Sequence, residues 1–211
     1  MTNPHNPTGQ CWSRHSLEEL LKENSLVICD EAFLPLVPNG EEESLIPLVN
    51  SYSNLIVLRS LTKLFSIAGL RLGYAISSTA RLEQWQSYRD PWPMNGLAIA
   101  VGIKLMTEQD ILRNQITKVQ NWVEREGAWL DTNLKNLTGI KTHPSSTNFQ
   151  LIEGKTSLVN FREILSRHNI LLRDCRSFKG LGEKWLRISL QTKSNNRQIV
   201  KIMEQIINSS L

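Results

Sequence analysis

The chain has 211 residues, which is enough for one or two modest domains. Hydrophobic residues make up 40% of it and charged residues 21%, a composition typical of globular proteins that excludes a disordered chain. The 24 Lys and Arg residues exceed the 20 Asp and Glu residues, giving a net charge of +4. These charges are spread along the chain rather than gathered in a basic stripe, which argues against nucleic-acid binding.

The longest apolar run, residues 97–101, is far shorter than the roughly 20 residues that a membrane span needs. The N-terminus has no basic start followed by an apolar core, so it does not resemble a secretory signal. Cys11, Cys29 and Cys175 form no C-x-x-C pair, so neither a disulfide framework nor a zinc site is predicted. We therefore expect a cytoplasmic protein without a metal site, bound to neither nucleic acid nor a membrane.

The first half of the chain alternates helix and strand signals. Ser16 and Glu19 are typical of a capping box, which predicts a helix running to about Asn24. Residues 34–50 hold three prolines and three consecutive glutamates, and are predicted to form an exposed loop or a short irregular helix. The apolar runs predict strands, the first two of them covered by helices on both faces. These runs are residues 26–29, 55–58 and 72–76.

Large apolar residues at steps of three or four predict a long helix over residues 112–137, ended by Gly139. At 1.5 Å per residue it would reach roughly 40 Å, enough to link two domains. We place the domains at residues 1–106 and 107–211. The predicted class is α/β in the first domain and α+β in the second. The second domain should contain strands at 149–152, 170–172 and 185–190, and helices at 158–168 and 199–207.

Polar residues of the first half fall at turns or at the ends of the predicted strands. Asn6 opens an Asn-Pro-Thr-Gly turn, and Asp30 closes the first strand. Lys63 follows the second strand, with Ser60 three residues before it and Arg71 eight residues after it. Ligands of open α/β sheets gather at the carboxyl ends of strands. Each residue alone has a structural interpretation as a turn, a cap or a surface charge, so it is the ordered set that indicates a site.

This ordered set resembles the large-domain signature of the fold type I pyridoxal-phosphate enzymes, the class I/II aminotransferase superfamily, and the resemblance covers nearly the whole chain. It implies that Lys63 joins covalently to the cofactor aldehyde and moves a proton at the substrate α-carbon. Asp30 would lie below the pyridine nitrogen and favour its protonated form. Asn6 would hydrogen-bond the phenolic oxygen of the cofactor, and the Asn6–Pro7 bond is a candidate for the cis state.

The resemblance also implies a clamp for the cofactor phosphate, formed by Ser60 and Arg71 with Thr62 assisting. Arginine suits this role because its planar fork matches two phosphate oxygens. In the second half, Arg187 resembles the strand arginine that grips the substrate carboxylate, with an internal salt bridge as the structural alternative. Two further residues match weaker family positions near the substrate, where a purely structural role is equally open: Asn148 and Arg173.

Within the superfamily the sequence is similar to the branch that contains threonine-phosphate decarboxylases and histidinol-phosphate aminotransferases. Phe33 stands where most aminotransferases have tyrosine, and residues 91–95 resemble the decarboxylase form of a loop beside the cofactor. The structural alternatives are that Phe33 only fills the core and that Trp92 only packs under the long helix. These features favour a lyase that decarboxylates threonine phosphate to aminopropanol phosphate for cobalamin synthesis. A class I/II aminotransferase acting on an amino-acid substrate is the alternative.

Family members are much longer and normally homodimeric, with active sites at the subunit interface. The resemblance therefore implies an N-terminal half, ahead of residue 1, that carries a glycine-rich phosphate cradle and further sheet strands. The three remaining large-domain strands should be adjacent, with open edges and uncovered apolar faces. Three alternatives follow: an enzyme with a separately encoded or additional N-terminal part, an inactive truncated remnant, and a cofactor-sensing regulator. Dimerisation of the chain itself is left open.

Overall fold

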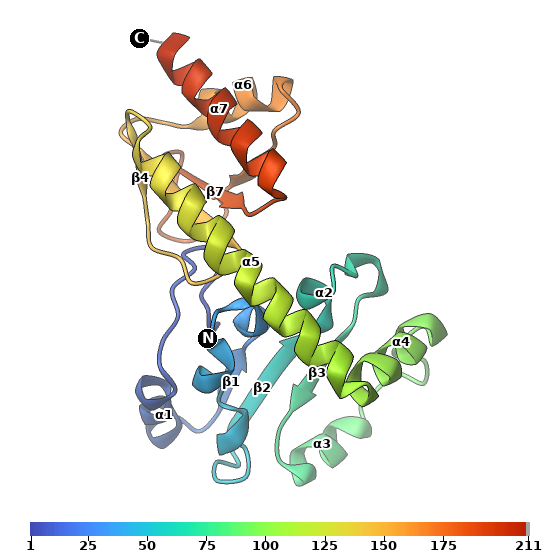
Figure 1. The fold of residues 1–211 in the computed structure, drawn as a ribbon. Helices are drawn as coiled ribbons and strands as arrows, with labels where there is room; N and C mark the ends of the chain where they lie inside the picture. Colours follow the sequence, from blue (N-terminus) through green and yellow to red (C-terminus); the bar gives the residue numbers. More distant parts are fainter. Residues whose placement is uncertain (210–211) are drawn as a thin grey trace. The chain divides into compact units, whose positions relative to one another are not determined.

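The computed structural model describes residues 1–209, which divide into two compact units. The units separate within the long helix α5 (Gln109–Lys135), between Asn121 and Trp122. A short N-terminal segment, His5–Gln10, groups with the second unit rather than with its neighbours in sequence. Figure 1 shows the succession of elements along the chain. The domain boundary between residues 106 and 107 stays a prediction.

Unit 1 is built on a three-stranded sheet in the order β1-β2-β3 (Figure 1). β1 and β2 are parallel, and β3 runs antiparallel to β2. This confirms the α/β class and the adjacency of the three predicted strands. Its strands are β1 (Val27–Asp30), β2 (Leu55–Ser60) and β3 (Gly73–Ile76). Its helices are α1 (Arg14–Glu23), α2 (Leu61–Leu64), α3 (Thr79–Gln86), α4 (Gly96–Thr107), and the 3-10 helices η1 (Leu34–Leu36), η2 (Gly40–Glu43), η3 (Ile46–Leu48) and η4 (Ala68–Leu70).

α1 begins earlier than the sequence predicted. Ser13 is its N-cap, and the Ser13 hydroxyl accepts a hydrogen bond from the backbone amide of Ser16 at 3.2 Å. The capping box at Ser16 and Glu19 is therefore wrong, and Glu19 instead forms an exposed ion pair with Lys22. A helix that starts one turn earlier places Leu17 inside it, where its amide donates to the Ser13 carbonyl at 3.1 Å.

The core of unit 1 lies between α1 and one face of the sheet. Leu17 and Leu21 of α1 are buried together with Val27 and Cys29 of β1. On the opposite face of β1, Ile28 is 43% exposed. The sequence predicted helices on both faces of β1, but only the face toward α1 is covered. The other face of this edge strand is open and apolar, as was also predicted.

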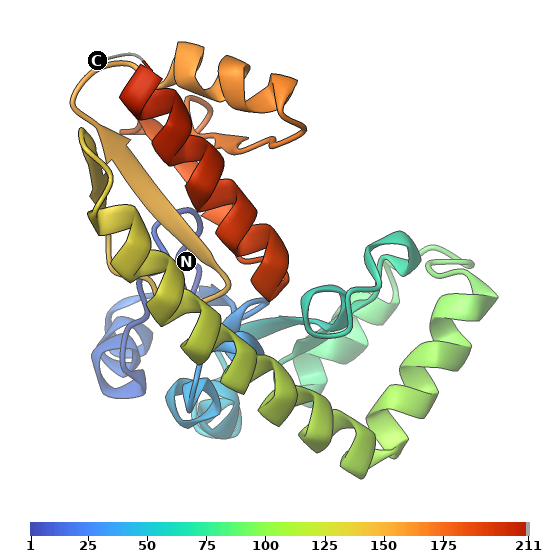
Figure 2. The ribbon, with the colours of Figure 1, turned by 45° about the horizontal axis from the view of Figure 1, so that its top comes forward.

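Unit 2 contains an antiparallel sheet in the order β4-β5-β7-β6, which confirms the α+β class of the second half. Helices α6 and α7 contact each other beside this sheet (Figure 2). The predicted long helix is confirmed as α5, whose Leu130 and Leu134 are fully buried. The elements of unit 2 are β4 (Ile140–Thr142), β5 (Phe149–Gly154), α6 (Val159–Arg167), β6 (Arg173–Asp174), β7 (Trp185–Ser189) and α7 (Lys193–Ser209).

The strand predicted over residues 170–172 is wrong. The strand in this region is β6, which starts at Arg173 and pairs with β7. Ile170 and Leu172 are buried while Leu171 is 73% exposed, so the apolar run alternates without pairing to another strand. Burial against the rest of unit 2, and not a β-ladder, accounts for these apolar residues.

The sequence did not predict the helices α2, α3, α4 and η4 or the strand β4. α4 had a usable signal, because the Asn95 side chain caps it by accepting a hydrogen bond from the Ala98 amide at 2.8 Å. Its exposed side carries large apolar residues, with Leu97 65% and Ile103 61% exposed. Within residues 1–209, no helix is both long enough and apolar enough to cross a membrane.

The Asn6-Pro7-Thr8-Gly9 turn packs against the segment between β4 and β5. The Asn6–Pro7 bond is cis, as the resemblance implied. The Ser146 amide donates to the Gly9 carbonyl at 2.9 Å, and Gly9 has a φ of 74°. A Cβ at Gly9 would lie 2.0 Å from the Ser145 hydroxyl oxygen. This turn therefore requires glycine for both its backbone conformation and its close contact.

We expect Gly9→Ala to lower the free energy of unfolding by roughly 1–3 kcal/mol, because it combines a left-handed backbone with a steric clash. Urea unfolding followed by tryptophan fluorescence measures the change. Gly182→Ala is the matched control, because a Cβ there meets no atom within 4 Å. Equal stability of the two variants would contradict the role given to Gly9.

Candidate functional site

The carboxyl ends of β1 and β2 bring together polar residues that the sequence placed in the cofactor site. Asp30 is the last residue of β1 and Ser60 the last residue of β2. Because the two strands are parallel, with Asp30 opposite Leu58, both residues lie at the same edge of the sheet. α2 starts directly after Ser60 and carries Lys63.

The Asp30 carboxylate is held by one of its two oxygens. Its Oδ1 accepts a hydrogen bond from the Ala32 amide at 2.9 Å. Its Oδ2 accepts no hydrogen bond from any of the residues that the structure describes. The side chain is therefore oriented by its own turn while one anionic oxygen remains available to a ligand.

The Lys63 amine faces an aromatic ring. Its Nζ lies 5.2 Å from the centre of the Phe33 ring, and Phe33 follows Asp30 by three residues. This contact places Lys63 beside the segment that continues from Asp30. The amine forms no ion pair with a carboxylate in the described part of the chain, and the residue is exposed. An amine that is accessible and not paired with an acid is suited to attack a carbonyl carbon.

The three residues expected to clamp a phosphate lie around the end of β2. The Thr62 hydroxyl is buried and donates to the Leu72 carbonyl at 3.3 Å. Arg71 is exposed, has a φ of 53°, and donates from Nη1 to the Ala68 carbonyl at 3.2 Å. Arg71 precedes β3, whose first residue, Gly73, lies opposite Ser60. Their role as a phosphate clamp stays a prediction.

A second group of predicted site residues lies in unit 2 and centres on Arg187 of β7. Arg187 donates from Nη1 to the Asn6 side-chain oxygen at 2.5 Å, and its guanidinium lies 4.7 Å from the centre of the Phe149 ring. Its Nε is buried without a hydrogen-bond partner, and no carboxylate pairs with it among residues 1–209. The internal salt bridge considered for Arg187 is therefore not found.

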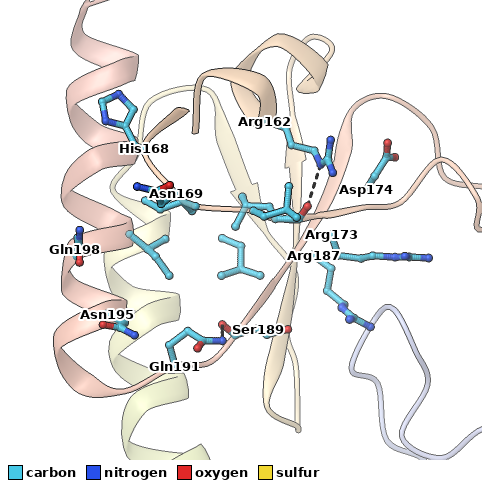
Figure 3. A pocket seen from close by; sticks show the side chains of 15 residues that line it. Arg162, His168, Asn169, Arg173, Asp174, Arg187, Ser189, Gln191, Asn195 and Gln198 are labelled. Atoms are coloured by element: carbon cyan, nitrogen blue, oxygen red, sulfur yellow. Dashed lines mark hydrogen bonds between the residues drawn. The ribbon is translucent and has the colours of Figure 1, made fainter. Parts of the chain in front are cut away.

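Arg173 lies directly opposite Arg187 in the ladder between β6 and β7. Residues in such positions share one face of a sheet, and Figure 3 shows both side chains directed to the same side. Burial lowers the pKa of the Arg187 guanidinium, and the charge of Arg173 lowers it further, against an opposing effect of Cys175. Two neighbouring cations, with no carboxylate paired to Arg187 among residues 1–209, are suited to bind an anion.

Both arginines line a cavity of about 700 Å³ in unit 2 (Figure 3). Sequence reasoning missed Arg162, which also lines this cavity and donates from Nε to the Leu172 carbonyl at 2.9 Å. The only sequence signal for Arg162 was its position in the predicted helix at 158–168, which could turn its side chain inward. Asn148 does not line the cavity; its carbonyl accepts from the Leu190 amide at 2.8 Å. A substrate-binding role for Asn148 stays a prediction.

The described residues contain no group of three or more His, Cys, Asp or Glu side chains that could hold a metal ion. The site residues instead form two sets, one in each unit. Unit 1 brings together an acid, hydroxyls and a lysine at one sheet edge, namely Asp30, Ser60, Thr62, Lys63 and Arg71. Unit 2 brings together Asn6, Arg173 and Arg187.

The chain is thus a two-unit α/β protein. Its first unit carries an acid and a lysine at the carboxyl ends of parallel strands, and its second unit carries two adjacent arginines. The sequence profile of the aminotransferase class I and II family matches residues 1–203. The chain belongs to this family. The fold confirms the resemblance that the sequence motifs indicated.

Similar proteins carry two functional names at nearly equal identity. A histidinol-phosphate aminotransferase of Thermoanaerobacter sp. strain X514 is 31% identical over 98% of this chain and 56% of its own length. A threonine-phosphate decarboxylase of Salmonella typhimurium is 29% identical over 98% of this chain and 57% of its own length. The chain thus spans about half the length of these curated relatives.

A solved structure supports the fold. The histidinol-phosphate aminotransferase from Clostridium acetobutylicum superposes with a TM-score of 0.90 at 23% sequence identity. The match covers 99% of this chain and 63% of that protein. At this identity the likeness establishes the fold alone.

We expect Asn6→Ala to destabilise unit 2 by roughly 1–3 kcal/mol, because it removes the oxygen that accepts a hydrogen bond from the half-buried Arg187. The loss leaves a second unsatisfied nitrogen beside Nε. Urea unfolding is the measurement, and Asn6→Asp, which keeps an acceptor oxygen, is the control. Wild-type stability of Asn6→Ala would show that the hydrogen bond does not hold Arg187.

Proposed function

We infer that the chain supplies cofactor- and substrate-binding residues of a pyridoxal-phosphate-dependent enzyme that decarboxylates threonine phosphate to aminopropanol phosphate. The observation that carries this proposal is the accessible Lys63 amine, which lies beside the segment following Asp30 in a member of the aminotransferase class I and II family. The family supports the enzyme class, and the residues around the site support the proposed reaction and substrate.

The residues present fit pyridoxal phosphate. The Lys63 amine has no acidic partner among the residues described, which suits covalent attachment to an aldehyde carbon. Asp30 offers one carboxylate oxygen to a protonated ring nitrogen, and its negative charge favours that protonated form. Arg71 and the hydroxyl of Ser60 are suited to hold the phosphate at the end of β2. Bound pyridoxal phosphate supplies an electron sink for the pair of electrons released at the substrate α-carbon.

Lys63 has a second task after carbon dioxide leaves. With the cofactor bound, the protonated Lys63 amine would return a proton to the substrate α-carbon. In a transaminase the same amine would instead remove the α-hydrogen. The orientation in which the surrounding residues hold the substrate would decide which bond at its α-carbon breaks.

The paired arginines of unit 2 support a substrate with two anionic groups. Threonine phosphate carries a carboxylate and a phosphate, whereas histidinol phosphate carries a phosphate alone. Arg187 and Arg173 lie opposite each other and line one cavity, so they are suited to hold two anions or one doubly charged group. We assign the carboxylate to Arg187, because its partly buried guanidinium lacks a carboxylate partner among the described residues.

Phe33 supports decarboxylation over transamination. A tyrosine at this position would offer a second hydroxyl to the phenolic oxygen of the cofactor, and Phe33 instead presents its ring to Lys63. The aminotransferase remains the second candidate, because relatives named for the two reactions match at 31% and 29% identity. Because these identities are similar, the choice between decarboxylase and aminotransferase depends on which product the chain forms.

The experiment incubates the chain with pyridoxal phosphate and threonine phosphate and measures released carbon dioxide. We expect aminopropanol phosphate as the organic product. Transfer of the amino group to 2-oxoglutarate would overturn the decarboxylase in favour of the aminotransferase. If a folded chain gives neither product, then this chain alone has neither activity.

Lys63→Ala should lower the rate of carbon dioxide release on the order of 10³-fold or more, because it removes the covalent attachment point and the proton donor together. Lys201→Ala is the matched control, since Lys201 is an exposed lysine on α7. Reduction with borohydride followed by peptide mass spectrometry locates the attached cofactor. A cofactor adduct that persists unchanged in Lys63→Ala would refute the assignment.

A further inference from the structure

A buried ion pair links the ends of the two parallel strands of unit 1. Glu31 directly follows Asp30, and Arg59 directly precedes Ser60. The Glu31 side chain is fully buried and that of Arg59 is 4% exposed, and Nη2 of Arg59 lies 2.8 Å from Oε2 of Glu31. The structural feature is therefore a desolvated charge pair placed immediately beside two residues of the predicted cofactor site.

The Glu31 carboxylate has a partner on each oxygen. Oε1 accepts a hydrogen bond from the Leu45 amide at 2.8 Å, and Oε2 accepts one from the Ser44 hydroxyl at 2.8 Å. The Arg59 guanidinium also donates to Ser44 Oγ at 2.8 Å. Burial raises the pKa of the Glu31 carboxyl, while the charge of Arg59 opposes this effect. The network therefore ties both strand ends to the segment at residues 44–45.

Arg59 has a further anchor on the surface. Its Nη1 and Nη2 donate to the two carboxylate oxygens of Glu41 at 2.7 and 2.9 Å, and Glu41 is 43% exposed. Burial lowers the pKa of Arg59, but its hydrogen bonds and charge contacts with Glu41 and Glu31 raise it overall. A planar guanidinium held by two carboxylates and a hydroxyl has little freedom to rotate. These contacts anchor the side chain of the residue that directly precedes Ser60 in β2.

Successive side chains of a strand point to opposite faces of the sheet. The buried Arg59 side chain therefore lies on the face opposite the Ser60 side chain. The ion pair can restrain the position of the strand ends from behind, without occupying the face on which Ser60 lies. The Glu31 amide also donates to the Leu58 carbonyl at 2.9 Å, so backbone and side chain of Glu31 both hold β2.

We propose that the Glu31–Arg59 pair is a positioning device that fixes the carboxyl ends of β1 and β2, and with them Asp30 and Lys63, for attachment of the cofactor. The inference deepens the proposed function and rests on it. Neither residue needs to touch the cofactor or the substrate. A small displacement of a reacting group is costly, since about 1 Å can reduce a rate on the order of 10²-fold.

The test compares this pair with a second buried carboxylate of the same chain. Glu126 of α5 is 1% exposed and pairs with Arg197 in unit 2. Glu31→Gln and Glu126→Gln each replace a buried carboxylate with a neutral amide of similar shape. Arg59→Lys keeps the charge of Arg59 and removes its fork. Each variant is measured at a temperature well below the midpoint of its own thermal unfolding. Loss of folded protein then does not affect the comparison.

The first measurement is the rate at which pyridoxal phosphate, trapped with borohydride, becomes attached to Lys63, quantified by peptide mass spectrometry. We expect Glu31→Gln to lower this rate about tenfold or more, with Arg59→Lys intermediate and Glu126→Gln unchanged. A Glu31→Gln rate equal to that of the parent chain overturns the inference and leaves the proposed function intact. An equal loss in Glu126→Gln also overturns it, because the effect would then be one of general stability.

The second measurement needs no cofactor. Amide hydrogen exchange of the peptide that contains residues 60–64 should accelerate about tenfold in Glu31→Gln and remain unchanged in Glu126→Gln. If the parent chain does not attach the cofactor at Lys63, the proposed function fails and this exchange measurement alone decides whether the pair fixes the strand end. Unchanged exchange in Glu31→Gln overturns the inference in either case.

Discussion

Asp30 lies opposite Leu58 in the parallel ladder between β1 and β2, and this register decides where the reactive groups of unit 1 lie. Parallel strands end at the same edge of a sheet, so the acid that ends β1 and the lysine that follows β2 share one edge. The antiparallel addition of β3 then brings the segment with Arg71 to the same place, since Gly73 lies opposite Ser60. A shift of one residue in the first ladder would turn every side chain of β1 to the other face.

In unit 2, the placement of two positive charges defines the candidate substrate site, as strand register defines the candidate cofactor site in unit 1. Arg187 and Arg173 are brought side by side by the ladder between β6 and β7, although like charges in this arrangement repel. The amide oxygen of Asn6 and the ring of Phe149 contact Arg187, but neither neutralises its charge. A pair of cations maintained at the wall of a cavity is consistent with an anionic ligand, which is the basis for the phosphorylated amino acid proposed as substrate.

Two buried carboxylates of this chain form similar ion pairs at different places in the fold. Glu126 joins α5 to α7 through Arg197, far in sequence from any predicted site residue. Glu31 joins the ends of β1 and β2 through Arg59, each one residue away from a predicted site residue. Burying a charge is unfavourable unless its partners are held in good geometry, so such pairs contribute more to defining one arrangement than to stability. The position of the pair, rather than its chemistry, distinguishes the two cases.

The sequence by itself determined the family, the strand end at Asp30, the place of Lys63 just after the second strand, and the long helix α5. Each of these is encoded by a local motif or by apolar periodicity. It placed the N-cap of α1 one turn late, because a hydroxyl in the sequence does not reveal which backbone amide it will bind. It also misplaced the strand at 170–172, because an apolar run does not reveal which strand it will pair with. Only the tertiary structure decided that Asn6 accepts from Arg187, 181 residues away, and that Arg173 lies opposite it. Contacts between residues so distant in sequence depend on how the whole chain packs, and no local pattern encodes them.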